Sequence, residues 1–427
     1  MLVRHAREPN LRDVRQRLPP ALRLRDFALL WGSILTNGLA AQMLAVAIGW
    51  QVYVIHHNPF DLGLVGLMEF LPLPFLALPA GQLADHLPRR AVTAASYVLT
   101  ILIAVGLVVV TLDGARKLWP FLALAAAAGV ASVIGNPAAR AMTREIVPEE
   151  LIPGAMALRS VAGQIGSIAG PALGGVIFSV DPVAVYATSA GLLTMSLLEI
   201  IAMRPALQSF VTTEPPGWDS LVAGVRFIWR TRTLLGAISL DLFGVLLGDA
   251  IALAPVFASS ILHTGPVGLG LLRTSPAVGA LVGAVLLARR PLQRRAGPAM
   301  LAIVAIFGVA TIVFGLSKWL PLSMAALVVT GFVDMVRVNI RSTAVSLLTP
   351  PQLQGRVAAV EWVFIGASNE LGAFWSGSFA RLIGTVPSVV AGGGAMIGIA
   401  GTWKRFFPSL ARLGRLEDLR PEPVPAR

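Results

Sequence analysis

The sequence predicts an all-helical membrane protein with twelve transmembrane helices in two pseudo-symmetric bundles of six. Of its 427 residues, 56% are hydrophobic and only 13% are charged, whereas soluble domains carry about 25% charged residues. Twelve stretches are long and apolar enough to cross a bilayer, which takes about 20 such residues. The longest polar break, residues 204–233, separates six of these stretches from the other six.

Short polar, proline-marked or glycine-marked breaks separate the predicted spans. The spans are residues 27–55, 62–84, 91–112, 118–139, 155–179, 183–203, 234–262, 268–288, 298–316, 321–347, 357–383 and 386–407. The resulting organisation is a basic cytoplasmic tail over 1–26, a first bundle over 27–203, a central cytoplasmic loop over 204–233, a second bundle over 234–407 and a cytoplasmic tail over 408–427.

The distribution of basic residues predicts the orientation of the chain in the membrane. With the N-terminus inside, 26 of the 34 Lys and Arg residues fall in cytoplasmic segments, and only Arg116, Lys117 and Lys318 fall in outer loops. Cytoplasmic loops carry the excess of Lys and Arg in membrane proteins. We therefore predict a multi-pass protein of the cytoplasmic (inner) membrane with both termini inside. The basic first tail either enforces this topology or also lies on anionic headgroups.

The composition also excludes several classes of function. The net charge of +12 does not indicate nucleic-acid binding, because apolar runs separate the basic clusters. The chain has no cysteine and therefore no disulfide, thiolate nucleophile or cysteine-based metal site. The phosphate-binding loop of ATP-hydrolysing proteins requires a Gly-Lys pair. In this sequence no lysine follows a glycine, so that loop is absent. We expect no metal, no other cofactor and no enzymatic activity.

The loop between the second and third predicted spans carries a motif. Residues 81–90 read GQLADHLPRR. This resembles the G-x-L-A-D-R-x-G-R-R signature of the major facilitator superfamily, with Pro88 in place of a glycine, and the resemblance implies a secondary transporter. Asp85 ends a helix, where it can pair with Arg140 and approach the start of the eleventh span. We interpret these residues as part of a cluster that closes a cytoplasmic gate. The alternative is a loop that serves only to set the membrane topology. The predicted cluster is Gly81, Asp85, Arg89, Arg90 and Arg140.

The fifth predicted span contains a glycine-rich stretch, GSIAGPALGG over residues 166–175. Glycines four residues apart share a helix face and let a neighbouring helix approach closely, and a proline removes one backbone hydrogen bond. The stretch resembles the G-x-x-x-G-P-x-x-G-G element of exporters in the same superfamily, although Ala157 stands where that pattern has an earlier glycine. The alternative to an exporter motif is that this stretch serves only the close packing of helices. The motif residues are Gly166, Gly170, Pro171, Gly174 and Gly175.

Further segments narrow the resemblance to one branch of the superfamily. Residues 136–140 (NPAAR), 147–151 (VPEEL) and 366–372 (GASNELG) are similar to the branch that contains enterobactin exporters and macrolide-efflux proteins. Ala373 and Trp375 stand where members of that branch carry acids, so we expect the cavity chemistry to be this chain's own. Trp375 is a candidate contact for a ring-bearing substrate, with packing inside the bundle as the alternative.

Charged and polar residues within the spans are candidates for a proton or substrate cavity. A charge at a helix centre costs about 2.5–3.5 kcal/mol on insertion scales, so it faces a wet cavity or a partner. A buried carboxyl group can carry a proton, and a static ion pair with Arg273, Arg337 or Arg341 is the alternative. Two amides in the first span fall within about 40° of one helix face. The candidates are Asn37, Gln51, Glu69, Asp241, Asp249, Asp334, Asn369 and Glu370.

The ends of the tenth and eleventh spans predict an ion pair. At about 1.5 Å of rise per residue, Glu361 and Arg341 lie at about the same depth below the cytoplasmic surface. The long Arg337 side chain can reach toward that depth. Because any one of these charges alone in hydrocarbon is costly, we predict that Glu361 pairs with Arg337 or Arg341.

Together these features predict a secondary active exporter of an amphiphilic or lipophilic small molecule, drug-like or siderophore-like. We expect alternating access around a midplane site and proton antiport. The expected partners are the small molecule, protons and the lipid bilayer, with no nucleic acid and with a functional monomer. The alternatives are an importer with the same fold and a non-transporting membrane sensor or enzyme.

Overall fold

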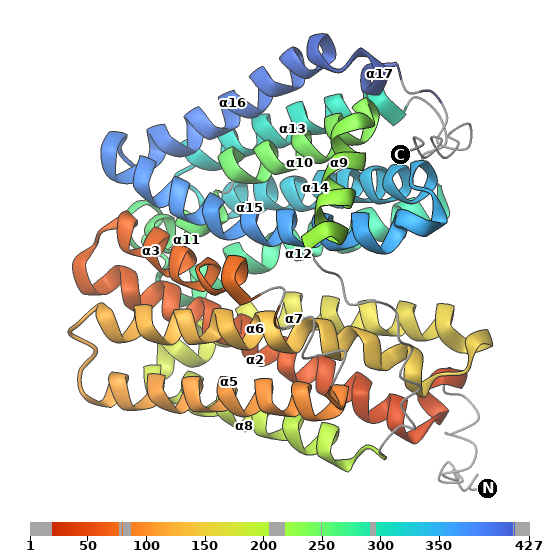
Figure 1. Ribbon diagram of the computed structural model, residues 1–427. Helices are drawn as coiled ribbons and strands as arrows, with labels where there is room; N and C mark the ends of the chain where they lie inside the picture. The colour runs from red at the N-terminus through yellow and green to blue at the C-terminus, as the bar shows by residue number, and fades with distance from the viewer. Residues whose placement is uncertain are drawn as a thin grey trace, which may run out of the picture.

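The computed structural model describes residues 19–76, 79, 87–204, 218–248, 250–290, 296–412 and 414. Within these residues every regular element is helical, as predicted (Figure 1). The first helix group is η1 (Pro20–Arg23), α2 (Arg25–His56), α3 (Pro59–Phe70), α5 (Arg89–Leu112), α6 (Trp119–Ile146), η2 (Glu149–Leu151), α7 (Ile152–Val180) and α8 (Pro182–Ala202).

The second helix group follows residues 205–217. It comprises α9 (Trp218–Arg230), α10 (Arg232–Gly248), η3 (Ile251–Leu253), α11 (Ala254–Val256), η4 (Phe257–Ile261), α12 (Gly265–Arg289), α13 (Ala296–Leu316), α14 (Leu320–Leu348), η5 (Pro351–Leu353), α15 (Gln354–Ile383), α16 (Thr385–Phe406) and α17 (Pro408–Ala411).

Eleven helical segments of the described chain are long and apolar enough to cross a membrane. α15 is also long, with 30 residues, but Glu361, Asn369 and Glu370 lower the hydropathy of its central part. The predicted span over 234–262 is not one regular α-helix. α10 ends at Gly248, and the chain continues through the short turns η3, α11 and η4. Pro255 contributes to this irregularity, since proline cannot donate a backbone hydrogen bond.

Short capped turns join consecutive helices and make them antiparallel. Asn58 accepts a hydrogen bond from the backbone N–H of Phe60 (3.1 Å) between α2 and α3. Asp181 accepts one from the N–H of Val183 (2.9 Å) between α7 and α8. In each case a proline occupies the first helical position, where its missing N–H is harmless.

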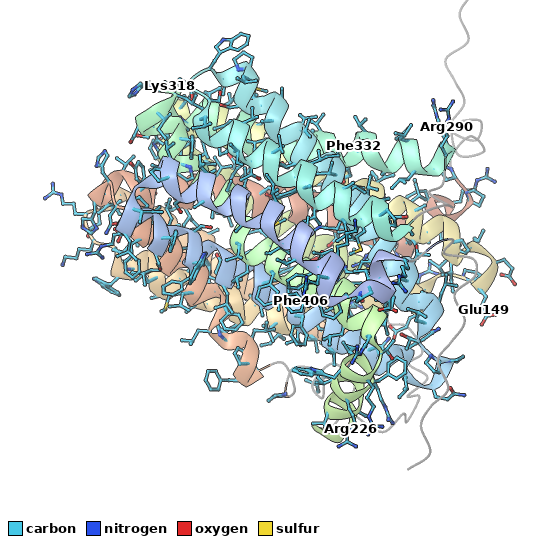
Figure 2. All side chains as sticks on the ribbon, turned by 90° about the horizontal axis from the view of Figure 1, so that it is seen from above. Glu149, Arg226, Arg290, Lys318, Phe332 and Phe406 are labelled. Atoms are coloured by element: carbon cyan, nitrogen blue, oxygen red, sulfur yellow. The ribbon has the colours of Figure 1, made fainter. Side chains whose placement is uncertain are left out.

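The antiparallel course gives the molecule two ends. The terminal end is where α2 and α10 begin and where α8 and α16 end. The far end holds the turns after α2, α7 and α15. Figure 2 shows Lys318 at the far end and Glu149 and Arg290 at the terminal end.

Helices pack mainly within their own group. α2 packs on α7 and α8, and α5 on α6 and α8, while α14 packs on α12 and α13, and α16 on α10 and α13. Two pairs cross between the groups with extensive contact, α7 with α12 and α3 with α15. Figure 1 shows the second pair side by side at the boundary between the groups.

Candidate functional site

A cavity of about 400 Å³, the central cavity, lies between the two helix groups. Its walls come from α3 in the first group and from α10, η3, α12, α13, α14 and α15 in the second. The structure thus brings together four of the predicted cavity residues, Glu69, Asp334, Asn369 and Glu370, with Arg273 and Arg337 beside them.

Glycines bring α3 and α15 close together beside this cavity. A Cβ atom added to Gly66 would stand 2.9 Å from the Cβ of Ala373 and 3.1 Å from the carbonyl oxygen of Glu370. Only a glycine allows this approach. Glu69 follows Gly66 by three residues and so lies on a similar face of α3. This glycine-lined contact between α3 and α15, the seam, therefore places Glu69 and Glu370 in the wall of one cavity.

A chain of five charged side chains, the ion chain, runs from the central cavity into the second helix group. Arg337 on α14 contacts Asp334 one turn earlier, and its Nη1 lies 2.9 Å from Oδ1 of Asp241 on α10. Nη1 of Arg341 lies 3.5 Å from Oδ2 of Asp241 and 2.9 Å from Oε1 of Glu361 on α15. Asp241, Arg337 and Arg341 are 5%, 4% and 3% exposed. Charges this deeply buried require such partners.

The structure therefore places Glu361 against Arg341, one of its two predicted partners. Arg337 lies instead with Asp334 and Asp241. Sequence reasoning missed the role of Asp241 as the bridge between both arginines. The available signal was the spacing of the two arginines, which places them four residues apart on one helix face.

A second cavity, of about 510 Å³, lies nearer the terminal end. Asn136 and Arg140 on α6 form one wall, and residues of α14 and α15, among them Arg341 and Glu361, form the other. Arg140 of the predicted gate cluster thus borders the same cavity as the Arg341–Glu361 pair. Asn369 lines both this cavity and the central one.

The remaining gate-cluster residues are placed differently. Nη1 of Arg89 lies 2.8 Å from Oε1 of Glu145 on α6, and Arg90 donates to the carbonyl oxygen of Ile201 at the end of α8. These contacts tie the start of α5 to its own helix group. Gly81 and Asp85 lie outside the described residues, so the pairing of Asp85 with Arg140 stays a prediction.

Contacts between the groups gather at the far end and in the middle of the molecule. At the far end, the hydroxyls of Tyr53 and Ser260 are 2.8 Å apart, and the guanidinium of Arg381 lies 5.2 Å from the ring centre of Phe60. Residues of α3 and α15 also pack there through glycine, since a Cβ atom added to Gly377 would stand 2.7 Å from the carbonyl oxygen of Pro59.

In the middle, side chains join α7 to α12. Gln164 donates to the carbonyl of Ala277 (2.6 Å), and Thr274 donates to that of Ile168 (3.0 Å). Toward the terminal end, a Cβ atom added to Gly154 of α7 would meet nothing within 4 Å. The hydrogen bonds and close glycine contacts thus hold the two groups together at the far end and in the middle.

This arrangement can be compared with known proteins. Residues 18–411 match a major facilitator family model described as a transmembrane secretion effector. The chain belongs to the major facilitator superfamily. It is accordingly a transporter and not an enzyme, as the sequence predicts.

Two relatives cover almost the whole chain. The multidrug efflux pump Tap of Mycolicibacterium fortuitum is 27% identical over 400 residues, which are 90% of this chain and 96% of that protein. The enterobactin exporter EntS of Citrobacter koseri is 26% identical over 399 residues, 92% of each chain.

Solved structures share the fold at low identity. A bacterial homologue of the human lysosomal transporter Spinster, inward-facing and unoccupied, aligns with a TM-score of 0.71 and 13% identity over 95% of this chain and all of that one. A mutant form of the nucleoside transporter NupG aligns with a TM-score of 0.71 and 12% identity over 90% of this chain and all of that one.

In this major facilitator protein the glycine motif of α7 packs against two helices. Its glycines at 166, 170 and 174 face α2. A Cβ atom added to Gly170 would stand 2.6 Å from the Cβ of Gln42, and one added to Gly174 would stand 2.9 Å from the Cα of Met43. Gly175 faces α12, where an added Cβ would stand 3.1 Å from the Cα of Gly270. The carbonyl of Pro171 also contacts α12, 2.5 Å from a Cβ atom added to Gly270.

Three further predicted cavity residues that the structure describes, Asn37, Gln51 and Asp241, do not line the central cavity. Gln51 accepts a hydrogen bond from Tyr186 (2.7 Å) and donates to Thr111 (3.2 Å) inside the first helix group. Asn37 is half-buried in α2 and lines neither cavity. Asp241 lies behind Arg337, and Asp249 lies outside the described residues.

Proposed function

We propose that this chain is a secondary active exporter of an amphiphilic or lipophilic small molecule, drug-like or siderophore-like, that works by alternating access. The central cavity carries the proposal, because its carboxyl groups come from both helix groups: Glu69 from the first, and Asp334 and Glu370 from the second. A ligand held there touches both groups, so its binding can shift the equilibrium between two arrangements of them. The names of the relatives, a multidrug efflux pump and an enterobactin exporter, favour export.

We infer twelve spans, with α15 as the eleventh, and both termini in the cytoplasm of a cell whose inner membrane holds the protein. The excess of arginine on the terminal side supports this orientation. The far end then faces outward, and the contacts that hold the two groups together there correspond to an inward-facing state. The moving units would be the bundles over 27–203 and 234–407, joined by the loop over 204–233, in a functional monomer.

The proposed coupling is proton antiport through the ion chain. Three acids face two arginines in it, so uptake of one proton makes the chain neutral. Its two outer acids border different cavities, Asp334 the central one and Glu361 the second. Protons can therefore reach the ion chain from either cavity. Because its acids interact, a bound proton is shared by the ion chain as a whole. Asp249 stays a proposed further member of the cavity.

The proposed cytoplasmic gate is the cluster of Gly81, Asp85, Arg89, Arg90 and Arg140. Its support is the position of Arg140 on the wall of the second cavity, opposite Arg341 and Glu361. Closing this cavity would bring two arginines, Arg140 and Arg341, close to a single carboxylate, Glu361. A further carboxylate such as Asp85 would balance the excess positive charge.

The test uses the full-length protein in liposomes with an imposed proton gradient, no ATP, and Hoechst 33342 as the transported probe. We expect uphill movement of the dye that stops when a protonophore is added. Uphill transport without a proton gradient would overturn antiport. Binding of the dye with no movement across the bilayer would overturn transport itself.

A further inference from the structure

A smaller hollow, the side pocket, lies within the second helix group beside the end of α10. It measures about 190 Å³ and is bounded by α10, η3, α13, α15 and α16. Trp375, which is 44% exposed, is one of its lining residues. Its indole stacks on Phe379, with ring centres 5.4 Å apart and planes 16° from parallel. The hydroxyl-bearing residues of the pocket are Thr311, Ser376 and Ser388.

The side pocket and the central cavity share a wall. Gly248, Ala250 and Thr311 line both of them. Gly248 is the last residue of α10, and the next helical turn begins at Ile251. Two of the three residues of the shared wall thus lie at or after the last described residue of α10 and before the start of η3.

Thr311 stands in this shared wall with an unused hydroxyl. The residue is 2% exposed, and its Oγ1 has no hydrogen-bond partner among the described residues. Leaving a buried hydroxyl unpaired is unfavourable. A polar atom of a ligand in either hollow would satisfy it.

The rim of the side pocket is on an outward apolar face of α15. Leu382 follows Trp375 by seven residues, close to two helical turns, and is 77% exposed. Ala391, another exposed residue of the pocket, lies on the neighbouring α16. In a membrane-spanning bundle such an apolar exposed face contacts lipid.

We propose that the side pocket binds the planar aromatic part of a lipophilic substrate taken directly from the bilayer, with Thr311 hydrogen-bonded to a polar atom of that substrate. This inference rests on the proposed function and adds a route and a chemical class to it. The pocket is smaller than the about 300–1,000 Å³ of drug-sized sites. It therefore holds one ring system, stacked on the Trp375–Phe379 pair, while the rest of the molecule extends past Thr311 to the central cavity.

The proposal is tested with full-length protein in liposomes and Hoechst 33342, a bilayer-soluble dye with several aromatic rings. Three variants alter the pocket: Thr311→Val removes the hydroxyl at nearly constant volume, Trp375→Ala removes the stacking surface, and Ala391→Trp fills the rim from outside. Trp319→Ala is the matched control, because Trp319 is also an exposed tryptophan (66%) but lies at the far end of α13–α14. We expect the KM for the dye to rise about tenfold in each pocket variant and to stay unchanged in the control, with kcat within twofold throughout.

A second measurement reads the site directly. An aryl azide derivative of the dye, activated by light, should label residues 375–379 or 388–395, and Ala391→Trp should abolish that label. Unchanged KM values with no label in these segments would overturn the side pocket while leaving the exporter intact. Labelling there in a protein that moves no dye would overturn the exporter while supporting the pocket. Copurification of a lipid acyl chain in the pocket that the dye fails to displace would also overturn the proposal.

Discussion

The two helix groups hold their buried polar residues in different ways. In the middle of the first group the partners are neutral: Tyr186 and Thr111 hold Gln51, and the hydroxyls of Thr36 and Ser196 are 2.6 Å apart. The ion pairs of this group, Arg89–Glu145 and His56–Asp61, lie at its two ends. In the second group the partners are ionic, in the chain that runs from Asp334 through both arginines and Asp241 to Glu361.

The difference separates two tasks. Neutral hydrogen bonds do not depend on proton concentration across the ordinary pH range, so the first group can serve as a constant frame. An ion chain with unequal numbers of acids and bases has a charge that depends on proton uptake. We therefore expect substitutions in the ion chain to change coupling, and substitutions among the neutral hydrogen bonds of the first group to change stability alone.

The largest expected effect comes from Asp241→Asn, which deprives both arginines of their shared carboxylate. Removing one partner of a buried ion pair costs about 3–5 kcal/mol, so the variant should lose most of its folded population. Thermal unfolding in detergent, followed by size-exclusion chromatography, measures this. Glu199→Gln is the control, since the first-group Glu199 has the neutral partner Thr36 at 3.3 Å. Equal stability of both variants would contradict the comparison.

A smaller loss is expected for Glu361→Gln, which leaves Arg341 with Asp241 as its remaining partner. The side chain of Glu361 is 16% exposed, so we expect a cost of about 1–3 kcal/mol. Adding Arg341→Gln should restore part of the folded abundance. A double variant no more abundant than the single one shows that the pair does not contribute.

Within the central cavity, Glu69→Gln and Glu370→Gln should change coupling without unfolding the protein. We expect downhill exchange of Hoechst 33342 to persist, while accumulation against a gradient falls to passive equilibration. Liposome assays with and without a preset dye gradient separate these activities. If Glu69→Gln alone keeps full accumulation, coupling lies in the second helix group only, and the comparison becomes sharper.

The smallest effect is expected for Thr111→Val in the first group. It removes the two hydrogen bonds between Thr111 and Gln51, each worth about 1 kcal/mol. The melting temperature should fall slightly, and the pH dependence of dye efflux should match that of the unaltered protein. A shifted pH profile would show that the first group also takes part in coupling.

Features that are local in sequence could be predicted, and features that join distant helices could not. The helical class follows from apolar stretches, and the superfamily from motifs within ten residues. The depth of Glu361 relative to Arg341 follows from two consecutive antiparallel helices. By contrast, Asp241 lies on α10, far from α14 in sequence, so the spacing of the two arginines on α14 did not by itself identify Asp241 as the bridge. Gln51 shares a helix face with Asn37, but Tyr186 and Thr111 take up its hydrogen bonds in the structure.

The seam between α3 and α15 has one more consequence. It is closed by glycines resting on backbone, with the carbonyl oxygens of Pro59 and Phe374 covered by Gly377 and Gly63. When the far end opens, the helix surfaces that these glycines cover become accessible to water. Opening therefore takes up water, and its equilibrium responds to osmotic pressure. Solutes too large to enter the seam would hold the far end shut, through the activity of water alone.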